Sequence, residues 1–151
     1  MANDRSGRPL WAPWRREFIR SQKDKKNCFL CGKKTSFATD EETHIVARGE
    51  HCYMILNRYP YNSGHLMVTP FRHVGDISEL TEPERVEMFN MTISAKELLG
   101  EVLDPDGFNV GINLGSSAGA GLEDHIHIHV VPRWSGDTNF MPVVADVRVM
   151  P

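Results

Sequence analysis

Short segments of apolar residues recur along the chain, some alternating with polar residues and some continuous, and both patterns predict β-strands. Glycine, proline and asparagine separate these segments and mark the turns between them. The predicted strands are a hairpin at 43–57 with its turn at Gly49-Glu50, a continuous strand at 66–68 that Pro70 closes, and a strand at 108–114.

Residues 125–130 alternate histidine with isoleucine and valine. Because successive side chains of a strand point to opposite faces, His125, His127 and His129 would line one face while the aliphatic residues between them enter a core. Imidazoles two positions apart in a strand are separated by roughly 6.6 Å, which lets them share a metal ion or a phosphate. A surface strand that carries incidental histidines is the alternative, and it leaves the alternation with core-forming residues unexplained.

Residues 81–103 carry the longest helical pattern. Thr81 offers an N-cap hydroxyl, Pro83 falls in the first turn, and acidic residues lie at the positive end of the helix dipole. The segment 104–107 ends the helix. The residues predicted to face the core are Val86, Phe89, Ile93, Leu99 and Leu103. The residues predicted to face solvent are Glu87, Asn90, Ser94, Glu97 and Glu101.

Length, charge and cysteine count restrict the class of protein. A chain of 151 residues can bury an adequate core as one domain without covalent staples. A formal net charge of −3 and a pI near 6.1 do not favour an electrostatic hold on nucleic acid or on a membrane surface. No segment is apolar for long enough to span a bilayer, and three cysteines do not indicate a disulfide framework. We therefore expect a cytoplasmic protein with neither nucleic-acid nor membrane partners.

The order of these elements predicts the domain organisation. One clear helix among several strands predicts an α+β domain built on a largely antiparallel sheet. No internal repeat or linker divides it. A basic arm at 1–27 precedes the domain, and we expect Trp11 and Trp14 to anchor this arm on the domain body or on a partner subunit.

The sequence Cys28-Phe-Leu-Cys31 has the spacing of a zinc-binding turn, and two histidines would complete a tetrahedral site. The residues alone do not select those two histidines. The candidates are His44, His51, His65, His73 and the three of the histidine segment. A redox pair is an alternative, although no thioredoxin-like βαβ pattern surrounds the cysteines, and two unreactive thiols are another. Cys52 lies in an apolar strand and is expected to be a core thiol.

A loop rich in glycine and serine, residues 115–121, precedes the histidine segment. Its backbone N–H groups and hydroxyls can approach an anion because few side chains stand in the way. Neutral imidazole is a good nucleophile toward phosphorus, and phosphoryl transfer needs mainly positioning and charge neutralisation. Loop and histidines together indicate a phosphate-transfer site, in which a central histidine attacks phosphorus and a flanking one assists the leaving group.

Three segments carry a resemblance to a known family. They are His125-Ile-His-Ile-His-Val-Val131, Gly64-His-Leu-Met-Val-Thr-Pro70 and Asn113-Leu-Gly-Ser-Ser-Ala-Gly119. Together they resemble the histidine triad (HIT) superfamily of nucleotidyl hydrolases and transferases. The resemblance covers residues 28–140 and leaves 141–151 as a C-terminal extension. It implies a HIT-like α+β fold with a mainly antiparallel five-stranded sheet, one long helix and a short N-terminal helix or turn.

Flanking segments indicate the branch of the superfamily. Leu10-Trp-Ala-Pro-Trp-Arg15 and residues 134–140 resemble the bacterial diadenosine tetraphosphate phosphorylase-like members. Asn57-Arg-Tyr-Pro60 resembles the fragile-histidine-triad branch. Many members carry Gln or Ser just before the triad, whereas this chain has Gly121-Leu-Glu-Asp124 there, so the group that protonates the leaving group is not implied.

The resemblance also implies roles for single residues. His127 would be the nucleophile, His129 would contact the phosphate and assist the leaving group, and His125 completes the catalytic triad. The implied zinc ligands are Cys28, Cys31, His73 and His125, and the zinc would be structural. The implied nucleotide contacts are Asn57, Asn113, Ser117, Ala118 and Gly119.

The activity implied is cleavage of dinucleoside polyphosphates, such as diadenosine tetra- or triphosphate, through a covalent nucleotidyl-histidine. Phosphate would accept the nucleotidyl group in a phosphorylase and water in a hydrolase. Family members generally form homodimers through strands and the long helix. The alternatives are a nucleoside phosphoramidase, a nucleotide-binding signalling module with residual catalysis, and a zinc-structured interaction protein without a nucleotide site.

Overall fold

The computed structural model describes residues 28–31 and 39–137, and the structural statements below refer to these residues. The predicted N-terminal arm at 1–27 and the C-terminal extension at 141–151 lie outside them. None of the helices in the described ranges combines the length and the apolar character needed to cross a membrane.

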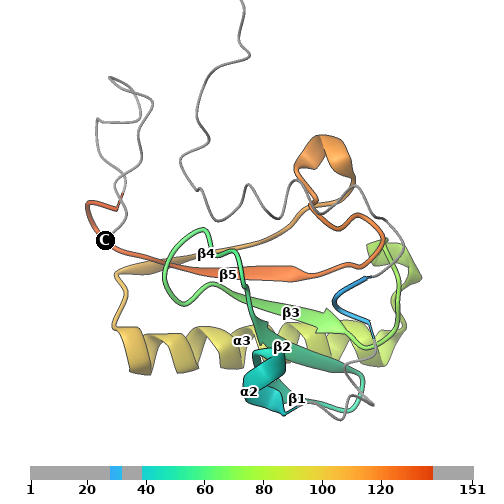
Figure 1. The fold of residues 1–151 in the computed structure, drawn as a ribbon, viewed down its shortest axis with the longest axis horizontal. Helices are drawn as coiled ribbons and strands as arrows, with labels where there is room; N and C mark the ends of the chain where they lie inside the picture. Colours follow the sequence, from blue (N-terminus) through green and yellow to red (C-terminus); the bar gives the residue numbers. More distant parts are fainter. Residues whose placement is uncertain (1–27, 32–38, 138–151) are drawn as a thin grey trace, which may run out of the picture.

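Five antiparallel strands form one sheet in the order β1-β2-β3-β5-β4 (Figure 1). The strands are β1 (Ile45–Arg48), β2 (Cys52–Leu56), β3 (Leu66–Pro70), β4 (Gly107–Ile112) and β5 (Ile128–Arg133). The helices are α2 (Asp40–Thr43), α3 (Glu82–Leu103) and the 3₁₀ turns η1 (Ile77–Glu79) and η2 (Ser116–Ala118). The predicted α+β fold, with five antiparallel strands and one long helix, is confirmed.

The long helix α3 begins and ends where the sequence predicts. The Thr81 hydroxyl accepts a hydrogen bond from the backbone N–H of Glu84, and the Glu84 carboxylate accepts one from the backbone N–H of Thr81. This capping box satisfies two N–H groups that a helix start otherwise leaves without an acceptor. Asp104 adopts a left-handed conformation with φ 46° and stops the helix.

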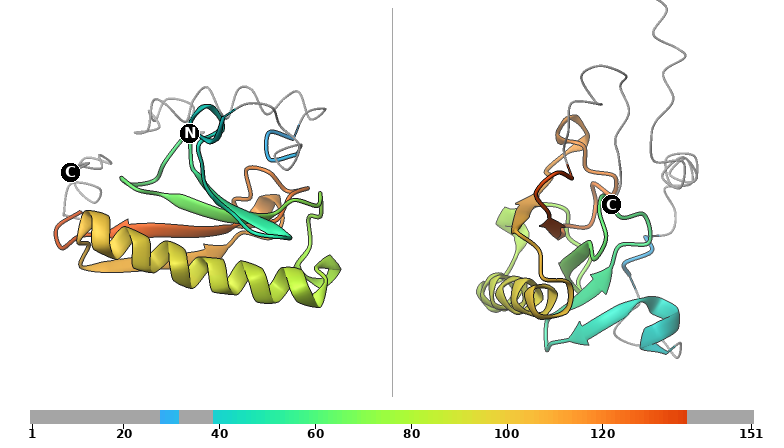
Figure 2. Two further views of the ribbon diagram at one scale, coloured as in Figure 1. Left: turned by 90° about the horizontal axis from the view of Figure 1, so that it is seen from below. Right: turned by 90° about the vertical axis from the view of Figure 1, so that its left-hand side faces the viewer.

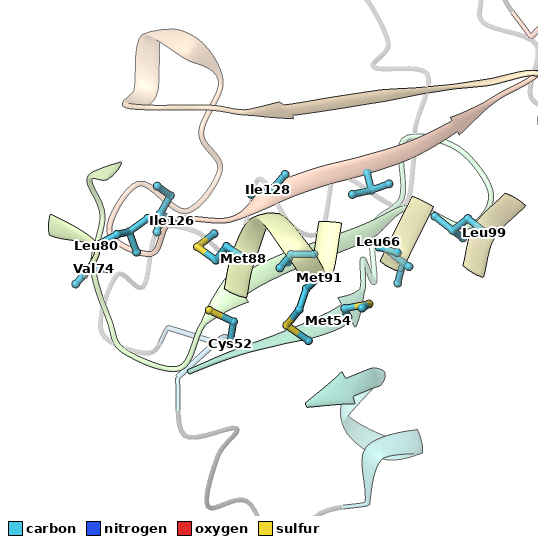
Figure 3. Packing of buried hydrophobic residues seen from close by; sticks show 13 residues of the cluster. Cys52, Met54, Leu66, Val74, Leu80, Met88, Met91, Leu99, Ile126 and Ile128 are labelled. Atoms are coloured by element: carbon cyan, nitrogen blue, oxygen red, sulfur yellow. The ribbon is translucent and has the colours of Figure 1, made fainter. Parts of the chain in front are cut away.

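The buried face of α3 differs from the predicted one. The helix runs along one face of the sheet (Figure 2) and packs across β2, β3 and β5. Its buried residues include Met88, Met91, Ala95 and Leu99, which meet the core side chains of the sheet (Figure 3). Of the predicted core residues, only Leu99 and Leu103 pack against this cluster. Val86, Phe89 and Ile93 are 55%, 66% and 45% exposed, so their assignment to the core is wrong.

Glu87 does not point freely into solvent as predicted. Its carboxylate accepts hydrogen bonds from the backbone N–H groups of Glu50, His51 and Cys52 at 2.8, 2.6 and 2.6 Å. Glu50 and His51 lie in the turn between β1 and β2, and Cys52 begins β2. A Cβ at Gly49 in the same turn would clash with the Glu87 carboxylate. Apolar residues occur on both sides of α3, and the hydrogen bonds of Glu87 favour the side that faces the sheet.

The opposite face of the sheet carries a second apolar cluster. It consists of Leu30, Ile45, Tyr53, Ile55 and Met67. Neighbours of these residues in β2 and β3 point toward α3, as alternation along a strand requires. The Tyr53 hydroxyl donates a 2.7 Å hydrogen bond to the backbone carbonyl of Leu30. The turn at 28–31 is thereby held against the sheet on the face away from α3.

The histidine segment is only partly a strand. Strand β5 starts one residue before His129, while His125, at a bend, and His127 lie ahead of it. The three aliphatic residues between and after the histidines are buried in the core with α3, as predicted. His125 and His127 are themselves buried, so the histidine face is covered by other parts of the chain and does not face open solvent.

Candidate active site and metal centre

The histidine segment meets a pocket on the sheet face opposite α3. The residues that line the pocket are Phe29, Asn57, Tyr59, Tyr61, Met67, Gly121, Leu122, His127 and His129. His127 and His129 are neighbours there, with ring centroids 4.7 Å apart and rings nearly perpendicular. His125 points elsewhere, toward the two cysteines of the turn at 28–31. The structure therefore divides the triad between two adjoining sites.

His127 is held in the tautomer that a nucleophile needs. Its Nδ1 lies 2.8 Å from the backbone carbonyl oxygen of His125. Because a carbonyl can only accept, Nδ1 carries the proton and Nε2 keeps its lone pair. Burial lowers the pKa of His127 below its ordinary value, which favours the neutral imidazole. His127 thus presents an unprotonated nitrogen.

A hydrogen bond from His65 fixes His129 in the tautomer opposite to that of His127. The backbone N–H of Tyr61 donates a 3.0 Å hydrogen bond to His65 Nδ1, so the proton of neutral His65 resides on Nε2. This Nε2 lies 2.8 Å from His129 Nδ1, which must accept. His129 therefore carries its proton on Nε2. His65 is buried and its ring stacks on Tyr61 at a centroid distance of 4.7 Å, which fixes it in place.

His65 contacts the triad in a way that the sequence did not predict. Sequence analysis grouped it with the possible zinc ligands, and the structure instead places it against the triad through His129. A signal was present, because a histidine directly before the continuous apolar segment of β3 must find a polar partner when buried.

Asn57 lies at the predicted nucleotide site, whereas four other predicted contacts do not line the pocket. The Asn57 Oδ1 accepts from the Tyr59 N–H at 2.9 Å, which directs its amide nitrogen toward His65 Nδ1 at 3.4 Å. The pocket-lining set includes Asn57 and Gly121 but not the contacts predicted in the preceding loop. Those four residues are Asn113, Ser117, Ala118 and Gly119, the last three of them exposed in or after η2.

The four predicted metal ligands come together. One ligand atom from each of Cys28, Cys31, His73 and His125 lies within 4.8 Å of all the others. His125 Nδ1 is 3.3 Å from Cys28 Sγ and 3.7 Å from Cys31 Sγ, and His73 Nδ1 is 3.1 Å from Cys31 Sγ. A sulfur and a nitrogen bound to one tetrahedral zinc ion are about 3.6 Å apart. This donor set and spacing fit zinc, and the two histidines that lie beside the cysteines are His73 and His125.

The tautomer of His125 also fits a cation. His125 Nε2 lies 2.8 Å from the carbonyl oxygen of Pro70, so its proton lies there and its Nδ1 lone pair faces the sulfurs. Burial lowers the pKa of His125 and raises the pKa of the Cys28 thiol to about 11. A metal ion would have to displace the thiol proton, as it does in thiolate sites generally.

The loop that carries His73 is tied to the start of α3. The Arg72 guanidinium donates through Nε and Nη2 to the two Glu84 carboxylate oxygens at 2.9 and 2.8 Å. The same guanidinium donates to the Glu79 carbonyl at 2.7 Å. Its hydrogen bonds lower the pKa of Glu84 to about 2. The loop between β3 and α3 is thus fixed beside the metal centre.

Comparisons with known proteins show which family this chain resembles. The family model described as HIT domain matches residues 38–136. The chain is 42% identical over 148 residues to AP-4-A phosphorylase of Mycobacterium tuberculosis (strain ATCC 25618 / H37Rv), covering 94% of this chain and 76% of that protein.

Two solved structures show the same fold. The NitFhit protein of C. elegans is 28% identical with a TM-score of 0.60, covering 63% of this chain and 23% of that one. This chain therefore matches less than a quarter of that fusion protein. A Zn-bound histidine triad family protein from Mycobacterium smegmatis is 25% identical with a TM-score of 0.57, covering 81% of this chain and 77% of that one.

Proposed function

Because the chain belongs to the HIT domain family, we propose that it is an enzyme that cleaves dinucleoside polyphosphates through a covalent nucleotidyl-histidine. The substrate class includes diadenosine tetra- and triphosphate. The observation that carries this proposal is the pair of opposite tautomers at adjacent histidines, an unprotonated Nε2 on His127 beside a protonated Nε2 on His129. The similarity to AP-4-A phosphorylase supports the substrate class.

The two histidines supply a nucleophile and an acid. His127 Nε2 attacks the α-phosphorus, a P–N bond forms, and the bond from that phosphorus to its bridging oxygen breaks. His129 donates its Nε2 proton to the departing polyphosphate oxygen and then accepts a proton from the incoming group. When inorganic phosphate attacks the nucleotidyl-histidine, the products of diadenosine tetraphosphate are ATP and ADP. When water attacks, they are ATP and AMP.

The remaining predicted site residues have supporting roles in this proposal. His125 orients the nucleophile through its carbonyl oxygen. Asn57 contacts the bound nucleotide from the pocket wall. Contacts from Asn113 and from residues 117–119 to phosphate or ribose rest on the family resemblance.

The metal in this proposal is a structural zinc ion held by Cys28, Cys31, His73 and His125. It would join the turn at 28–31 to the histidine segment and so hold His127 in register. The Zn-bound relative supports this assignment. Thiolate ligands must stay reduced, which is consistent with our proposal that the protein acts in the cytoplasm. Metal analysis of untagged protein tests it, and fewer than about half an equivalent of zinc per chain would contradict the four-ligand site.

We further propose that the HIT domain, residues 28–140, forms a homodimer. Two exposed features support this. Strand β4 lies at the edge of the sheet with Val110 exposed, and an edge strand offers backbone groups for pairing with a second chain. The outer side of α3 carries Val86, Phe89 and Ile93 as an apolar row at positions i, i+3 and i+7.

The deciding experiment incubates the purified protein with diadenosine tetraphosphate, with and without inorganic phosphate, and separates the nucleotides by chromatography. ATP plus ADP that appears only with phosphate identifies a phosphorylase, and ATP plus AMP without phosphate identifies a hydrolase. His127→Ala should abolish turnover while AMP still binds. Turnover of His127→Ala within about tenfold of wild type corresponds to only about 1.4 kcal/mol of barrier and would contradict the nucleophile assignment.

A further inference from the structure

The metal cluster, formed by Cys28, Cys31, His73 and His125, is open to solvent on one side. Cys31 and His73 are exposed, Cys28 is partly buried and His125 is buried. Cys52, the third cysteine of the chain, is buried in the apolar cluster that packs against α3. Small solutes can therefore reach the metal cluster at Cys31, whereas Cys52 is shielded from them.

The two thiols of the metal cluster lie close enough to form a disulfide with each other. Cys28 and Cys31 belong to one turn, in which the backbone N–H of Cys31 donates a 3.1 Å hydrogen bond to the carbonyl oxygen of Cys28. Their sulfurs are within 4.8 Å of each other, and both contact His125 Nδ1. The sulfurs of a disulfide are about 2.05 Å apart, so these two must approach each other by less than about 3 Å.

Cysteines that ligate a metal ion are also reactive toward oxidants. The thiolate is both the metal ligand and the nucleophile, and a thiol that coordinates a metal ion is deprotonated. Cysteines that respond to oxidants are solvent-accessible thiolates with a second cysteine nearby that completes a disulfide. Cys31 is the accessible one here, and Cys28 is the second cysteine in the same turn.

We propose that Cys28 and Cys31 form an oxidation site, at which hydrogen peroxide joins the two thiolates in a disulfide and thereby releases the metal ion. This inference rests on the proposed metal site and goes beyond the proposed function, because it makes the metal content of the protein depend on an oxidant. Oxidation would remove the link between the turn at 28–31 and the histidine segment, so the metal cluster gains a regulatory role besides a structural one.

The reaction proceeds in two displacements at sulfur and oxygen. The Cys31 thiolate attacks one peroxide oxygen, the O–O bond breaks, and a sulfenic acid forms on Cys31 while the departing hydroxide takes up a proton and leaves as water. The Cys28 thiolate then attacks the sulfenic sulfur, an S–S bond forms, and the S–O bond breaks. The second hydroxide also takes up a proton. Two electrons thus pass from the two sulfurs to one peroxide, which becomes two water molecules.

A disulfide leaves the metal ion with an incomplete set of ligands, although the surrounding chain keeps its other contacts. Its sulfurs are no longer thiolates, so only His73 and His125 remain as donors. The Tyr53 hydroxyl still donates to the Leu30 carbonyl at 2.7 Å, and His125 Nε2 still lies 2.8 Å from the Pro70 carbonyl oxygen. The metal ion can therefore leave and return while the turn and the histidine segment stay in place.

Treatment of the purified, untagged, zinc-loaded protein with hydrogen peroxide tests the proposal. After alkylation of the remaining thiols, mass spectrometry should find a disulfide between Cys28 and Cys31 and an alkylated Cys52. A chromophoric chelator should register the loss of about one zinc ion per chain over the same time course, and little loss without peroxide. Thiol reductant with added zinc should then restore both the metal content and the melting temperature of the untreated protein.

Two variants separate the cysteines. Cys52→Ala is the matched control, because it removes the thiol outside the metal cluster, and it should release zinc as the wild type does. Cys28→Ser removes the second thiol, so peroxide should give a sulfenic acid on Cys31 that a dione reagent traps, whereas the wild type should give little of this adduct.

The outcomes distinguish this inference from the metal site on which it rests. Zinc that stays bound after the disulfide has formed, or zinc release without a disulfide between Cys28 and Cys31, would overturn the inference. Wild-type protein that keeps both thiols and its zinc in excess peroxide would also overturn it. Reduced wild-type protein that never holds zinc would instead contradict the proposed metal site.

Discussion

Replacement of His65 by phenylalanine should impair catalysis without touching either reacting histidine. Phenylalanine preserves a flat ring that can stack on Tyr61, but it cannot accept from the Tyr61 N–H or donate to His129 Nδ1. Each of these two part-buried groups then loses its hydrogen bond to His65, at a cost of about 1–3 kcal/mol in folding free energy per group. The protein should therefore unfold at a lower temperature than wild type yet remain folded at 25 °C.

The catalytic effect follows from the tautomer of His129. Without the hydrogen bond from His65, the proton of His129 is no longer confined to Nε2, although its ring still contacts Tyr61 and His127. A positioned general acid contributes about 10²- to 10⁴-fold to a rate, and His65→Phe should lose part of it, about 10- to 1,000-fold in kcat. KM should change little, because His65 does not line the pocket.

His65→Gln is the matched control. A glutamine amide carries an acceptor and a donor in one side chain, so it can accept from Tyr61 and donate to His129 together. It should recover most of the activity that His65→Phe loses. The decisive assay is kcat for diadenosine tetraphosphate cleavage in the wild type, His65→Phe, His129→Ala and the double variant. If His65 acts through His129, His65→Phe lowers kcat no further once His129 is gone. A folded His65→Phe protein with kcat within about threefold of wild type, under about 0.7 kcal/mol, would refute the tautomer argument.

Three further outcomes test the fold around the site. Glu87→Ala should lower the free energy of unfolding by about 1–3 kcal/mol, because three backbone N–H groups lose their acceptor, whereas Glu97→Ala on the exposed side should change it little in the same urea titration. The pKa of Glu84, about 2, lies below its ordinary 4.5, so its ion pair with Arg72 stabilises the fold fully above pH 4.5 and loses this effect as the pH falls toward 2. The free energy of unfolding of Arg72→Gln should therefore differ from that of wild type above pH 4.5, and the difference should shrink as the pH falls toward 2. Phe89→Glu should convert the proposed homodimer to a monomer in light scattering, and an unchanged mass would exclude the outer side of α3 from the interface.

The sequence predicts the structure well where the types of residue at neighbouring positions determine it. Alternation predicted which side of the histidine segment enters the core, and Thr81 with Glu84 predicted the start of α3. The face of α3 was not predictable in the same way. Apolar residues occur on two sides of the helix, one through Met88 and one through Phe89, and either row could cover a sheet. Glu87 accepts three hydrogen bonds from residues 50–52, and these contacts favour burial of the row that contains Met88. A contact between residues so far apart in the sequence leaves no periodic pattern from which it could be predicted.

The chemistry of the triad depends on a different kind of information. The tautomers of His125 and His127 are set by carbonyl oxygens of Pro70 and of His125 itself, and any residue at those positions would supply the same carbonyl. The first contact joins the histidine segment to the end of β3, and the second lies within the segment itself, so neither follows from the residue types. His129 is the exception, because its acceptor role comes from the side chain of His65. A substitution at His65 can therefore impair the proposed general acid, His129, without altering the proposed nucleophile, His127. Changing His65 removes the partner that sets the tautomer of His129 and leaves that of His127 in place, whereas no side-chain substitution removes the carbonyl that orients His127.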